Sequence, residues 1–283
     1  MIRVDGATRV YAVLGHPARH SLSPPMQNAA FAAVGMNAVY VALDVSPARL
    51  EEALRGLHAC GVAGLNLTTP HKVAGFRLAI ETTEEARAVS AVNTLRWEAS
   101  GWRGHATDGI GFAAWVADAG IKIRGKRVLA LGAGGAIRSI LPRLVTLGAA
   151  EIAVVSRTPE HAAAVAASLE RTMPDRAAAA HAALEDESAA RRMGTWDVMV
   201  RALAVESISA AEERWWQALA KDAPVLDLNY AGRGDAARAQ ARAEGRRIED
   251  GLALLWHQGA ASFEFWTNVT APLHAMKAAL AGE

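Results

Sequence analysis

The fold is decided by the stretch Gly64-Leu65-Asn66-Leu67-Thr68-Thr69-Pro70-His71-Lys72. Apolar residues flank Asn66 and two β-branched threonines close the run, so residues 64–68 are predicted to form a short buried strand. Pro70 cannot donate a hydrogen bond to a neighbouring strand, and an apolar-periodic run after it indicates a helix. An amide, a hydroxyl and an amine thus stand at the end of a rigid strand, where open α/β folds place their chemistry. The alternative is a capped turn with a solvated lysine, and the rest of the chain must decide between the two.

Strands and helices alternate on both sides of this stretch. The predicted strands of the first half are 9–14, 37–45, 64–68 and one that starts within 90–95 before a turn near 100–101, and the predicted helices are 25–34, 47–59, the run after Pro70, and 110–119. The order β-α-β-α-β is typical of a parallel sheet with helices packed on it. The first half is therefore predicted to be an α/β domain.

Two serines stand where the first of these helices begins. Ser23 followed by Pro24 is a favourable pair for the N-cap and the first helical position. Ser21 and Ser23 would then lie beside free backbone N–H groups, which favour an anion such as a substrate carboxylate. The alternative is that both serines only cap the helix. Capping alone would also explain Thr107 and Asp108 at the start of the helix 110–119.

A glycine-rich turn opens the second half of the chain. The buried strand 126–131 runs into Gly132-Ala133-Gly134-Gly135-Ala136 and then into a helix over 137–147. A strand, a glycine turn and a helix form the phosphate cradle of dinucleotide-binding folds, because the backbone can approach the pyrophosphate and the helix N-terminus faces its charge. Ile137 occupies the position of the third glycine of the standard fingerprint, so the turn alone is weak support.

The end of the next strand bears on the choice of cofactor. The strand 151–155 is followed by Ser156-Arg157-Thr158, where a carboxylate would bind a ribose 2′-hydroxyl group. An arginine between two hydroxyl groups instead suits a 2′-phosphate, which indicates NADP. The alternative is a solvated arginine at a strand end.

The remainder of the chain completes this second domain and returns to helices. Residues 160–190 are rich in alanine and in charged residues and show no defined pattern. The further predicted strands are 196–203, 225–230 and 246–249. The further predicted helices are 235–245, a long helix opened by Asp250-Gly251, and 270–280. Gln258 stands among apolar neighbours in the long helix. It either bonds the backbone or points into a cleft.

Composition bounds the classes of protein to which the chain can belong. With 283 residues, 52% hydrophobic and 21% charged, it is globular and can bury one large core or two moderate ones. The net charge of +1 gives no electrostatic case for binding nucleic acid or an anionic membrane, and no apolar run reaches transmembrane length. The single Cys60 excludes an internal disulfide and a cysteine-based metal site, and we expect it to be a buried, inert thiol. The first residues lack the apolar segment of a signal peptide, so we expect a cytoplasmic protein.

Taken together, the segments resemble the shikimate dehydrogenase family over nearly the whole chain. The matching pieces are 20–24, 66–72, 91–94, 107–112, 132–136, 156–158, 227–230, 250–251, Gln258 and 263–266. Members of this family oxidise a ring hydroxyl group of shikimate or quinate with a nicotinamide cofactor. Each piece is short, but their order and spacing together are specific.

The resemblance implies a fold and a set of site residues. It implies two α/β domains around a cleft, the second a Rossmann-like doubly wound parallel sheet: residues 1–105 with 237–283 would bind substrate and 106–236 would bind NADP. Lys72 and Asp108 would form the acid–base pair. The other implied site residues are Ser21, Ser23, Asn66, Thr68, Asn93, Tyr230 and Gln258 for substrate, and Gly132, Ala133, Gly134, Gly135, Ala136, Ser156, Arg157, Thr158, Gly251 and Leu254 for cofactor, with no metal. Hydride leaves a carbinol only as its proton is taken, so a base within hydrogen-bond reach is required.

Several positions depart from the family pattern, while the proposed acid–base and hydroxyl-binding residues remain. Gln27 replaces a histidine, Ala106 an asparagine, Leu254 a methionine, and Arg201-Ala202-Leu203 stands where Asn-Ala-Thr is usual. Arg201 could reach either the pyrophosphate or solvent.

These departures bear on cofactor placement and on the identity of the substrate. The expected activity is NADP-dependent interconversion of shikimate and 3-dehydroshikimate; the alternatives are a paralogue acting on quinate, aminoshikimate or another hydroxy acid, and a non-catalytic nucleotide-binding sensor. A sensor need not keep the pair Lys72 and Asp108, which speaks against the last of these. The expected partner is a shikimate-like cyclic hydroxy acid and the expected assembly a monomer or a homodimer, between which the sequence does not choose.

Overall fold

The chain divides into two compact units in the computed structural model, which describes residues 4–172, 178–203, 205, 207–230, 232 and 234–281. The first unit is Met1–Gly111 with Leu255–Glu283, and the second is Phe112–Leu254. Residues 237–254, expected in the first domain, thus lie in the second unit. The reason is that β12 (Ile248–Glu249) pairs with β11 (Val225–Asp227), while Ala237 and Ala241 are buried in the second unit's core.

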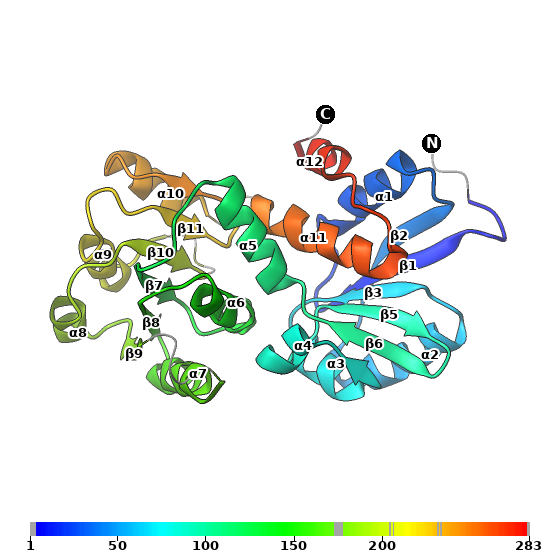
Figure 1. Ribbon diagram of the computed structural model, residues 1–283, viewed down its shortest axis with the longest axis horizontal. Helices are drawn as coiled ribbons and strands as arrows, with labels where there is room; N and C mark the ends of the chain where they lie inside the picture. The colour runs from blue at the N-terminus through cyan, green and yellow to red at the C-terminus, as the bar shows by residue number, and fades with distance from the viewer. Residues whose placement is uncertain are drawn as a thin grey trace. The chain divides into compact units, whose positions relative to one another are not determined.

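The first unit contains a six-stranded mixed sheet in the order β2-β1-β3-β5-β6-β4 (Figure 1). Its strands are β1 (Arg9–Gly15), β2 (Ala38–Asp44), β3 (Gly64–Leu67), β4 (Glu81–Thr82), β5 (Thr94–Glu98) and β6 (Gly101–His105). β1 pairs in parallel with β2 and β3, as the alternation of strands and helices predicts. β5 is antiparallel to β3 and to β6, because the short turn between β5 and β6 reverses the chain.

Helices cover both faces of this sheet. They are α1 (Ser23–Ala33), the 3₁₀ helix η1 (Pro47–Arg49), α2 (Leu50–Ala59), α3 (Lys72–Leu78), α4 (Glu84–Val89), α11 (Leu252–Thr267) and α12 (Leu273–Ala281), with α11 entering the unit at Leu255. α4 and β4 are not predicted from the sequence, because segments of six and two residues are too short to show a period. The other elements match the predicted ones with ends shifted by a few residues.

Alternation along β3 decides which side chains reach the site. Leu65 and Leu67 pack into one apolar cluster with Leu50 and Leu54 of α2. Asn66 lies between them and so points to the opposite face of the sheet. Gly64 shares that opposite face, where a Cβ atom would come within 2.6 Å of the Trp266 indole of α11. α11 therefore lies directly over Asn66.

The second unit is a doubly wound parallel sheet in the order β12-β11-β10-β7-β8-β9. Its other elements are β7 (Arg127–Leu131), β8 (Glu151–Ser156), β9 (Ala178–Ala183), β10 (Val198–Arg201), α5 (Asp108–Asp118), α6 (Gly135–Thr146), α7 (Pro159–Thr172), α8 (Glu187–Arg192), α9 (Ala210–Gln217) and α10 (Asp235–Ala243). One apolar cluster joins α5, α6 and α7 to one face, and another joins α8, α9 and α10 to the other. The strand order reverses between β7 and β10, and that is where such sheets bind ligands.

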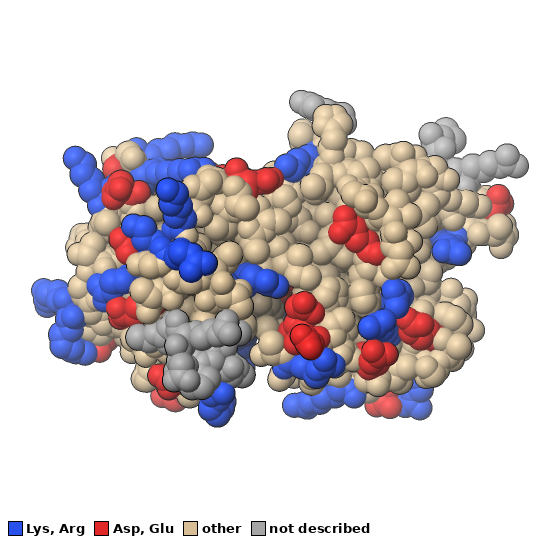
Figure 2. Space-filling view, viewed as in Figure 1, with Lys and Arg blue, Asp and Glu red and all other residues tan. Residues whose placement is uncertain are grey.

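The surface carries both signs of charge. Basic and acidic side chains lie interspersed on the face shown in Figure 2, in keeping with the net charge of +1. In the described part of the chain, no helix has the length and apolar character needed to cross a membrane. Cys60, expected to be buried, is exposed, so that prediction is wrong. It follows the last turn of α2 and lies off the face that buries Leu50 and Leu54.

Candidate active site

A lysine and an aspartate form an ion pair in the first unit. Lys72 opens α3 after the short turn that follows β3, and Asp108 opens α5. Lys72 Nζ donates to Asp108 Oδ2 at 2.6 Å, and the two side chains are 20% and 13% exposed. The pair is therefore largely buried yet open to a ligand. Lys72 is therefore not the solvated lysine on a capped turn that the sequence left as the alternative.

Asn93 ties this pair to three further groups. Its Oδ1 accepts from the Thr107 N–H at 2.7 Å, which fixes the orientation of the amide. Its Nδ2 then faces Asp108 Oδ1 at 2.9 Å, Thr107 Oγ1 at 2.8 Å and Gln258 Oε1 at 3.1 Å. An amide nitrogen has two hydrogens, so three acceptors share two donors. The cluster is ready to accept a hydrogen bond from a ligand hydroxyl group.

Gln258 of α11 bonds the backbone, which was the first of its two predicted alternatives. Its Nε2 donates to the Leu255 carbonyl at 2.9 Å, while its Oε1 is turned toward Asn93. Gly111 permits this arrangement, because a Cβ atom there would lie 2.4 Å from the Gln258 backbone nitrogen. α5 and α11 thus approach so closely that any larger residue at position 111 would move Gln258.

Asn66 is the buried anchor of the cluster. Its Oδ1 accepts from the Tyr40 hydroxyl group at 2.7 Å, and its Nδ2 donates to the Asn93 carbonyl at 2.9 Å. Burial raises the pKa of Tyr40 above its usual range, so the phenol stays protonated and donates. Asn66 Nδ2 also faces Ser262 Oγ at 3.0 Å. Tyr40 and Ser262 were not predicted from the sequence, although Ser262 lies four residues after Gln258 on the same helix face.

The two serines occupy the first turn of α1. The helix begins at Ser23 and its N-cap residue is Leu22, so the predicted N-cap is off by one position. No side chain caps this helix; Ser21 Oγ instead accepts from the Ser23 N–H at 3.2 Å. Ser23 is 8% exposed, and its hydroxyl group is near enough to the Tyr40 phenol to oppose the rise in the pKa of Tyr40 that burial causes. Tyr40, which donates to Asn66, therefore lies close to the start of α1.

Thr68, predicted to contact substrate, follows β3 and is half-buried. Its methyl group lies so near Gly15 that a Cβ atom at position 15 would come within 2.5 Å of it. The end of β1 and the end of β3 are therefore packed together beside the loop that leads to Ser21.

The second unit presents a turn that fits a dinucleotide. Gly132 follows β7 with a φ of +116°, a conformation that favours glycine, and its Cβ position faces Ala202 at 3.4 Å. Gly134, Gly135 and Ala136 are exposed at the start of α6, and Cβ atoms at both glycines would meet nothing within 4 Å. The first turn of α6 contains no acidic residue. An anion can therefore approach the N-terminal N–H groups without obstruction. Ile137, in place of a third glycine, is buried in the core beneath the turn.

The end of β8 lies one strand further along the sheet. Arg157 and Thr158 are exposed, whereas Ser156 is buried with its Oγ accepting from the Thr158 N–H at 3.3 Å. The structure therefore presents one guanidinium and one hydroxyl group at this strand end, and the second hydroxyl supports the turn.

Comparison with known proteins places this geometry in a family. Residues 13–95 match the model of the shikimate dehydrogenase substrate binding domain, 116–225 that of shikimate/quinate 5-dehydrogenase, and 251–281 that of the shikimate 5-dehydrogenase C-terminal domain. The shikimate dehydrogenase (NADP(+)) of Anaeromyxobacter sp. strain K is 43% identical over 98% of this chain and 97% of its own length. The chain belongs to the shikimate dehydrogenase family.

Solved shikimate dehydrogenases share the fold. Shikimate 5-dehydrogenase from Listeria monocytogenes, in complex with shikimate and NAD, superposes with a TM-score of 0.86 at 28% identity, covering 99% of both chains. The enzyme from Thermus thermophilus, in complex with NADP(H) and shikimate, gives 0.81 at 29% identity and covers 97% of this chain and 99% of its own. The prediction of two α/β domains, the second Rossmann-like, is confirmed.

Among the departures from the shikimate dehydrogenase pattern, Arg201 is the most consequential. It is fully buried, so it reaches neither a pyrophosphate nor solvent, and both expectations for it are wrong. Its Nε bonds Glu212 Oε1 at 2.6 Å and its Nη1 lies 3.4 Å from Asp227 Oδ2. Burial raises the pKa of Asp227, and the guanidinium opposes that rise. Arg201 is thus the cation of a buried ion triad.

Two other departures are buried inside the first unit. Gln27 of α1 donates to the Gly259 carbonyl of α11 at 2.9 Å, and its Oε1 has no hydrogen-bond partner among the described residues. Ala106 is buried in the apolar cluster under α2. Both substituted side chains are therefore buried inside the first unit, Gln27 in contact with α11 and Ala106 in the apolar cluster.

The remaining predicted residues belong to the second unit. Gly251 lies against the backbone of the residues that follow β11. Its N–H donates to the Asn229 carbonyl at 3.0 Å, and a Cβ atom at this position would come within 2.2 Å of the Leu228 carbonyl oxygen. Tyr230, next in the chain, is half-buried. Leu254 packs against the core cluster of the second unit. The structure thus brings Gly251 next to the Leu228-Asn229 backbone that leads into Tyr230.

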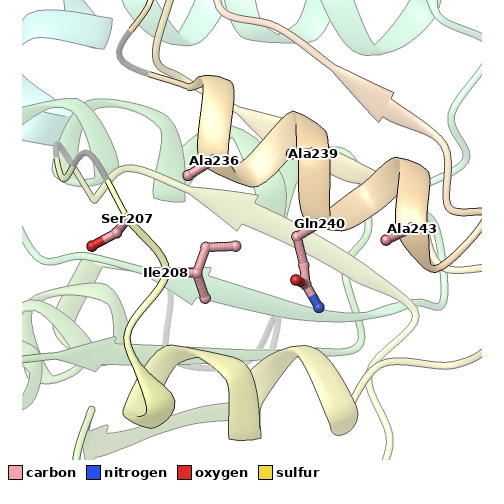
Figure 3. Close-up of a pocket in the computed structure, with 6 residues that line it drawn as sticks. All are labelled: Ser207, Ile208, Ala236, Ala239, Gln240 and Ala243. Atoms are coloured by element: carbon pink, nitrogen blue, oxygen red, sulfur yellow. The ribbon is translucent and has the colours of Figure 1, made fainter.

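One hollow in the second unit carries no chemistry of its own. Figure 3 shows it between Ile208 and α10, with a volume of about 460 Å³. Its lining is Ser207, Ile208, Ala236, Ala239, Gln240 and Ala243, none of which titrates. Within the described residues, no group of three or more His, Cys, Asp or Glu side chains could hold a metal ion.

Proposed function

We propose that the protein is an NADP-dependent shikimate dehydrogenase, which interconverts shikimate and 3-dehydroshikimate by hydride transfer. The observation that carries this proposal is the continuous cluster of Lys72, Asp108, Asn93 and Gln258. It combines an acid–base pair with more hydrogen-bond acceptors than donors, which suits a substrate with several hydroxyl groups. A nucleotide sensor would have no use for the pair.

The proposed mechanism assigns one role to each group. A nicotinamide cofactor, held by the glycine turn 132–136, would supply the acceptor for the hydride of the carbinol carbon. Lys72 takes the hydroxyl proton as the carbonyl forms, so that shikimate and NADP⁺ give 3-dehydroshikimate, NADPH and a proton. Asp108 holds the amine through the 2.6 Å bond, and Asn93 holds the other carboxylate oxygen. Gln258 Oε1, Asn66 and the half-buried Thr68 bind ring hydroxyl groups of the substrate.

For the substrate carboxylate we propose Ser21 and Ser23, and predict the effect of replacing both by alanine. The double variant should weaken shikimate binding by roughly 1–3 kcal/mol for each bond lost to the charged group and leave NADP binding unchanged. Isothermal titration of substrate and cofactor measures both. Ser209→Ala is the control, because Ser209 is a true N-cap that accepts from the Glu212 N–H. Unaltered shikimate affinity in the double variant would mean that the serines only support the helix start.

For the cofactor we propose that Gly132, Ala133, Gly134, Gly135 and Ala136 hold the pyrophosphate and that Arg157 with Thr158 holds the 2′-phosphate. Tyr230, Gly251 and Leu254 would lie toward the nicotinamide, with Tyr230 also near substrate. The exposed side chain of Arg157 and the absence of an acidic residue from the first turn of α6 support this assignment.

Arg157→Ala should lower NADP affinity selectively. A charge-assisted bond is worth about 1.5–3 kcal/mol, so the preference for NADP over NAD should fall by roughly one to two decades. Fluorescence titration with both reduced cofactors measures the preference. Arg171→Ala, an exposed arginine at the far end of α7, should change neither affinity. Tighter binding of NAD than of NADP by the unmodified protein would refute this role of Arg157.

The proposed function is tested by a reduction assay with NADP⁺ and NAD⁺ against shikimate, quinate and aminoshikimate. We expect the highest kcat/KM with shikimate and NADP⁺. Faster turnover of quinate or aminoshikimate would make the protein a paralogue with another substrate. No turnover of any of the three, with cofactor still bound, would favour the sensor. The oligomeric state, monomer or homodimer, and the cytoplasmic location stay predictions.

A further inference from the structure

The hydroxyl group of Ser262 lies at the centre of the polar cluster and is fully buried. Its Oγ is within hydrogen-bond distance of four atoms on four segments of chain. These are Asn66 Nδ2 at 3.0 Å, Thr94 Oγ1 at 2.7 Å, Thr107 Oγ1 at 3.1 Å and the Gln258 carbonyl oxygen at 3.0 Å. β3, β5, the start of α5 and the helix α11 thus meet at one oxygen.

The direction of these bonds follows from their partners. The bonds to Tyr40 and to the Asn93 carbonyl identify which atom of the Asn66 amide is oxygen and which is nitrogen. The nitrogen faces Ser262, so Asn66 donates to the Ser262 hydroxyl group. The Gln258 carbonyl can only accept. A hydroxyl group donates one hydrogen bond and accepts two. Ser262 donates to the Gln258 carbonyl and accepts from Asn66, so it can accept one more hydrogen bond, from either Thr94 or Thr107 at a time. Ser262 is therefore both a hydrogen-bond donor and a hydrogen-bond acceptor within the cluster.

The contacts of Ser262 lie on both sides of Asn93. Asn66 bonds the Asn93 carbonyl, and Thr107 bonds the Asn93 amide through both its N–H and its hydroxyl group. Asn93 in turn bonds Asp108 Oδ1. Loss of the Ser262 hydroxyl would leave buried polar atoms unpaired directly behind the acid–base pair, and their repacking would move the Asn93 amide.

We propose that Ser262 is a positioning residue of the active site, which fixes the Asn93 amide and through it the Asp108 carboxylate facing Lys72. The proposal rests on the proposed function. The competing explanation is that Ser262 merely bonds the carbonyl four residues earlier, as helix serines commonly do. Thr267 makes that same bond, to the Phe263 carbonyl at 2.8 Å on the same helix, and lies outside the cluster. It supplies a matched control.

The test compares Ser262→Ala with Thr267→Ala in kcat, in KM for shikimate, in NADPH affinity and in melting temperature. Ser262→Ala should lower kcat/KM about tenfold to a hundredfold, mostly through kcat, with NADPH affinity unchanged. Thr267→Ala should leave kcat and KM unchanged. Ser262→Cys, which keeps the volume and a weak donor, should show an intermediate loss and replaces the alanine variant if that variant fails to fold.

A double-mutant cycle separates positioning from general loosening. Thr107→Val removes the partner hydroxyl group at similar volume. Combined with Ser262→Ala, it should lower kcat by little more than the larger of the two single changes, whereas independent effects of the two changes on kcat would multiply. If Ser262→Ala or Ser262→Cys keeps kcat within twofold of the unmodified protein, the role of Ser262 is refuted while the proposed function stands. If the unmodified protein turns over no substrate, the proposed function and this proposal fall together.

Discussion

Lys72→Ala lowers kcat for shikimate oxidation by roughly 10²–10⁴, the usual worth of general acid–base catalysis. The variant removes the only group in the cluster that can both take and return the hydroxyl proton beside Asp108. The side chain is 20% exposed and stands at the first position of α3, so the space that its truncation vacates is open to water. Steady-state kinetics at saturating shikimate and NADP⁺ measure the loss.

The accompanying controls separate chemistry from binding. NADP affinity should barely change, because Lys72 and the glycine turn belong to different units. Arg77→Ala, in the last turn of the same helix, should leave kcat unchanged. If Lys72→Ala turns over at near the normal rate, the proton is taken by another group and the assignment of Lys72 is wrong.

Arg201→Ala destabilises the second unit by about 3–5 kcal/mol, because it leaves Glu212 and Asp227 buried without their cation. The two carboxylates are 1% and 0% exposed, so water cannot replace the guanidinium. Chemical denaturation followed by tryptophan fluorescence reports the change directly, since Trp216 donates to Glu212. Selective loss of NADP binding in a protein of normal stability would contradict this account.

A neutral triad distinguishes the lost ion pair from the lost volume. Arg201→Met combined with Glu212→Gln and Asp227→Asn removes all three charges and keeps acceptors for the Trp216 and Asn229 donors. We expect this triple variant to recover most of the stability that Arg201→Ala loses. Arg55→Ala breaks an exposed pair with Glu51 on α2, and it should produce no measurable change.

Much of the fold was predictable because it depends on local patterns. The alternation around Asn66 indicated a strand, and the glycines at 132–135 indicated a turn between a strand and a helix; both are present. The acid–base pair was predictable only through the resemblance, since Lys72 and Asp108 are 36 residues apart and no spacing rule joins them.

What the sequence could not provide were partners brought together by packing. The sequence around Arg201 indicates a ligand for phosphate or a solvated residue, because its partners Glu212 and Asp227 lie 11 and 26 residues away. Ser262 and Tyr40 escaped notice because neither residue type is distinctive alone. The compact units divide at Leu255 rather than at 237, because β12, only two residues long, pairs with β11, and that pairing is visible only in three dimensions.

The first unit is built from two ends of the chain, and this sets the order in which the protein can fold during synthesis. Asn66 and Ser262 are 196 residues apart, and Thr107 and Ser262 are 155 apart. The whole of the second unit must leave the ribosome before these contacts form, so that unit can fold while the first still lacks α11. Until then the sheet face that carries Gly64 and Asn66 has no Trp266 to cover it. A chain released before Leu255 would therefore carry the complete second unit joined to a first unit whose sheet face is still uncovered.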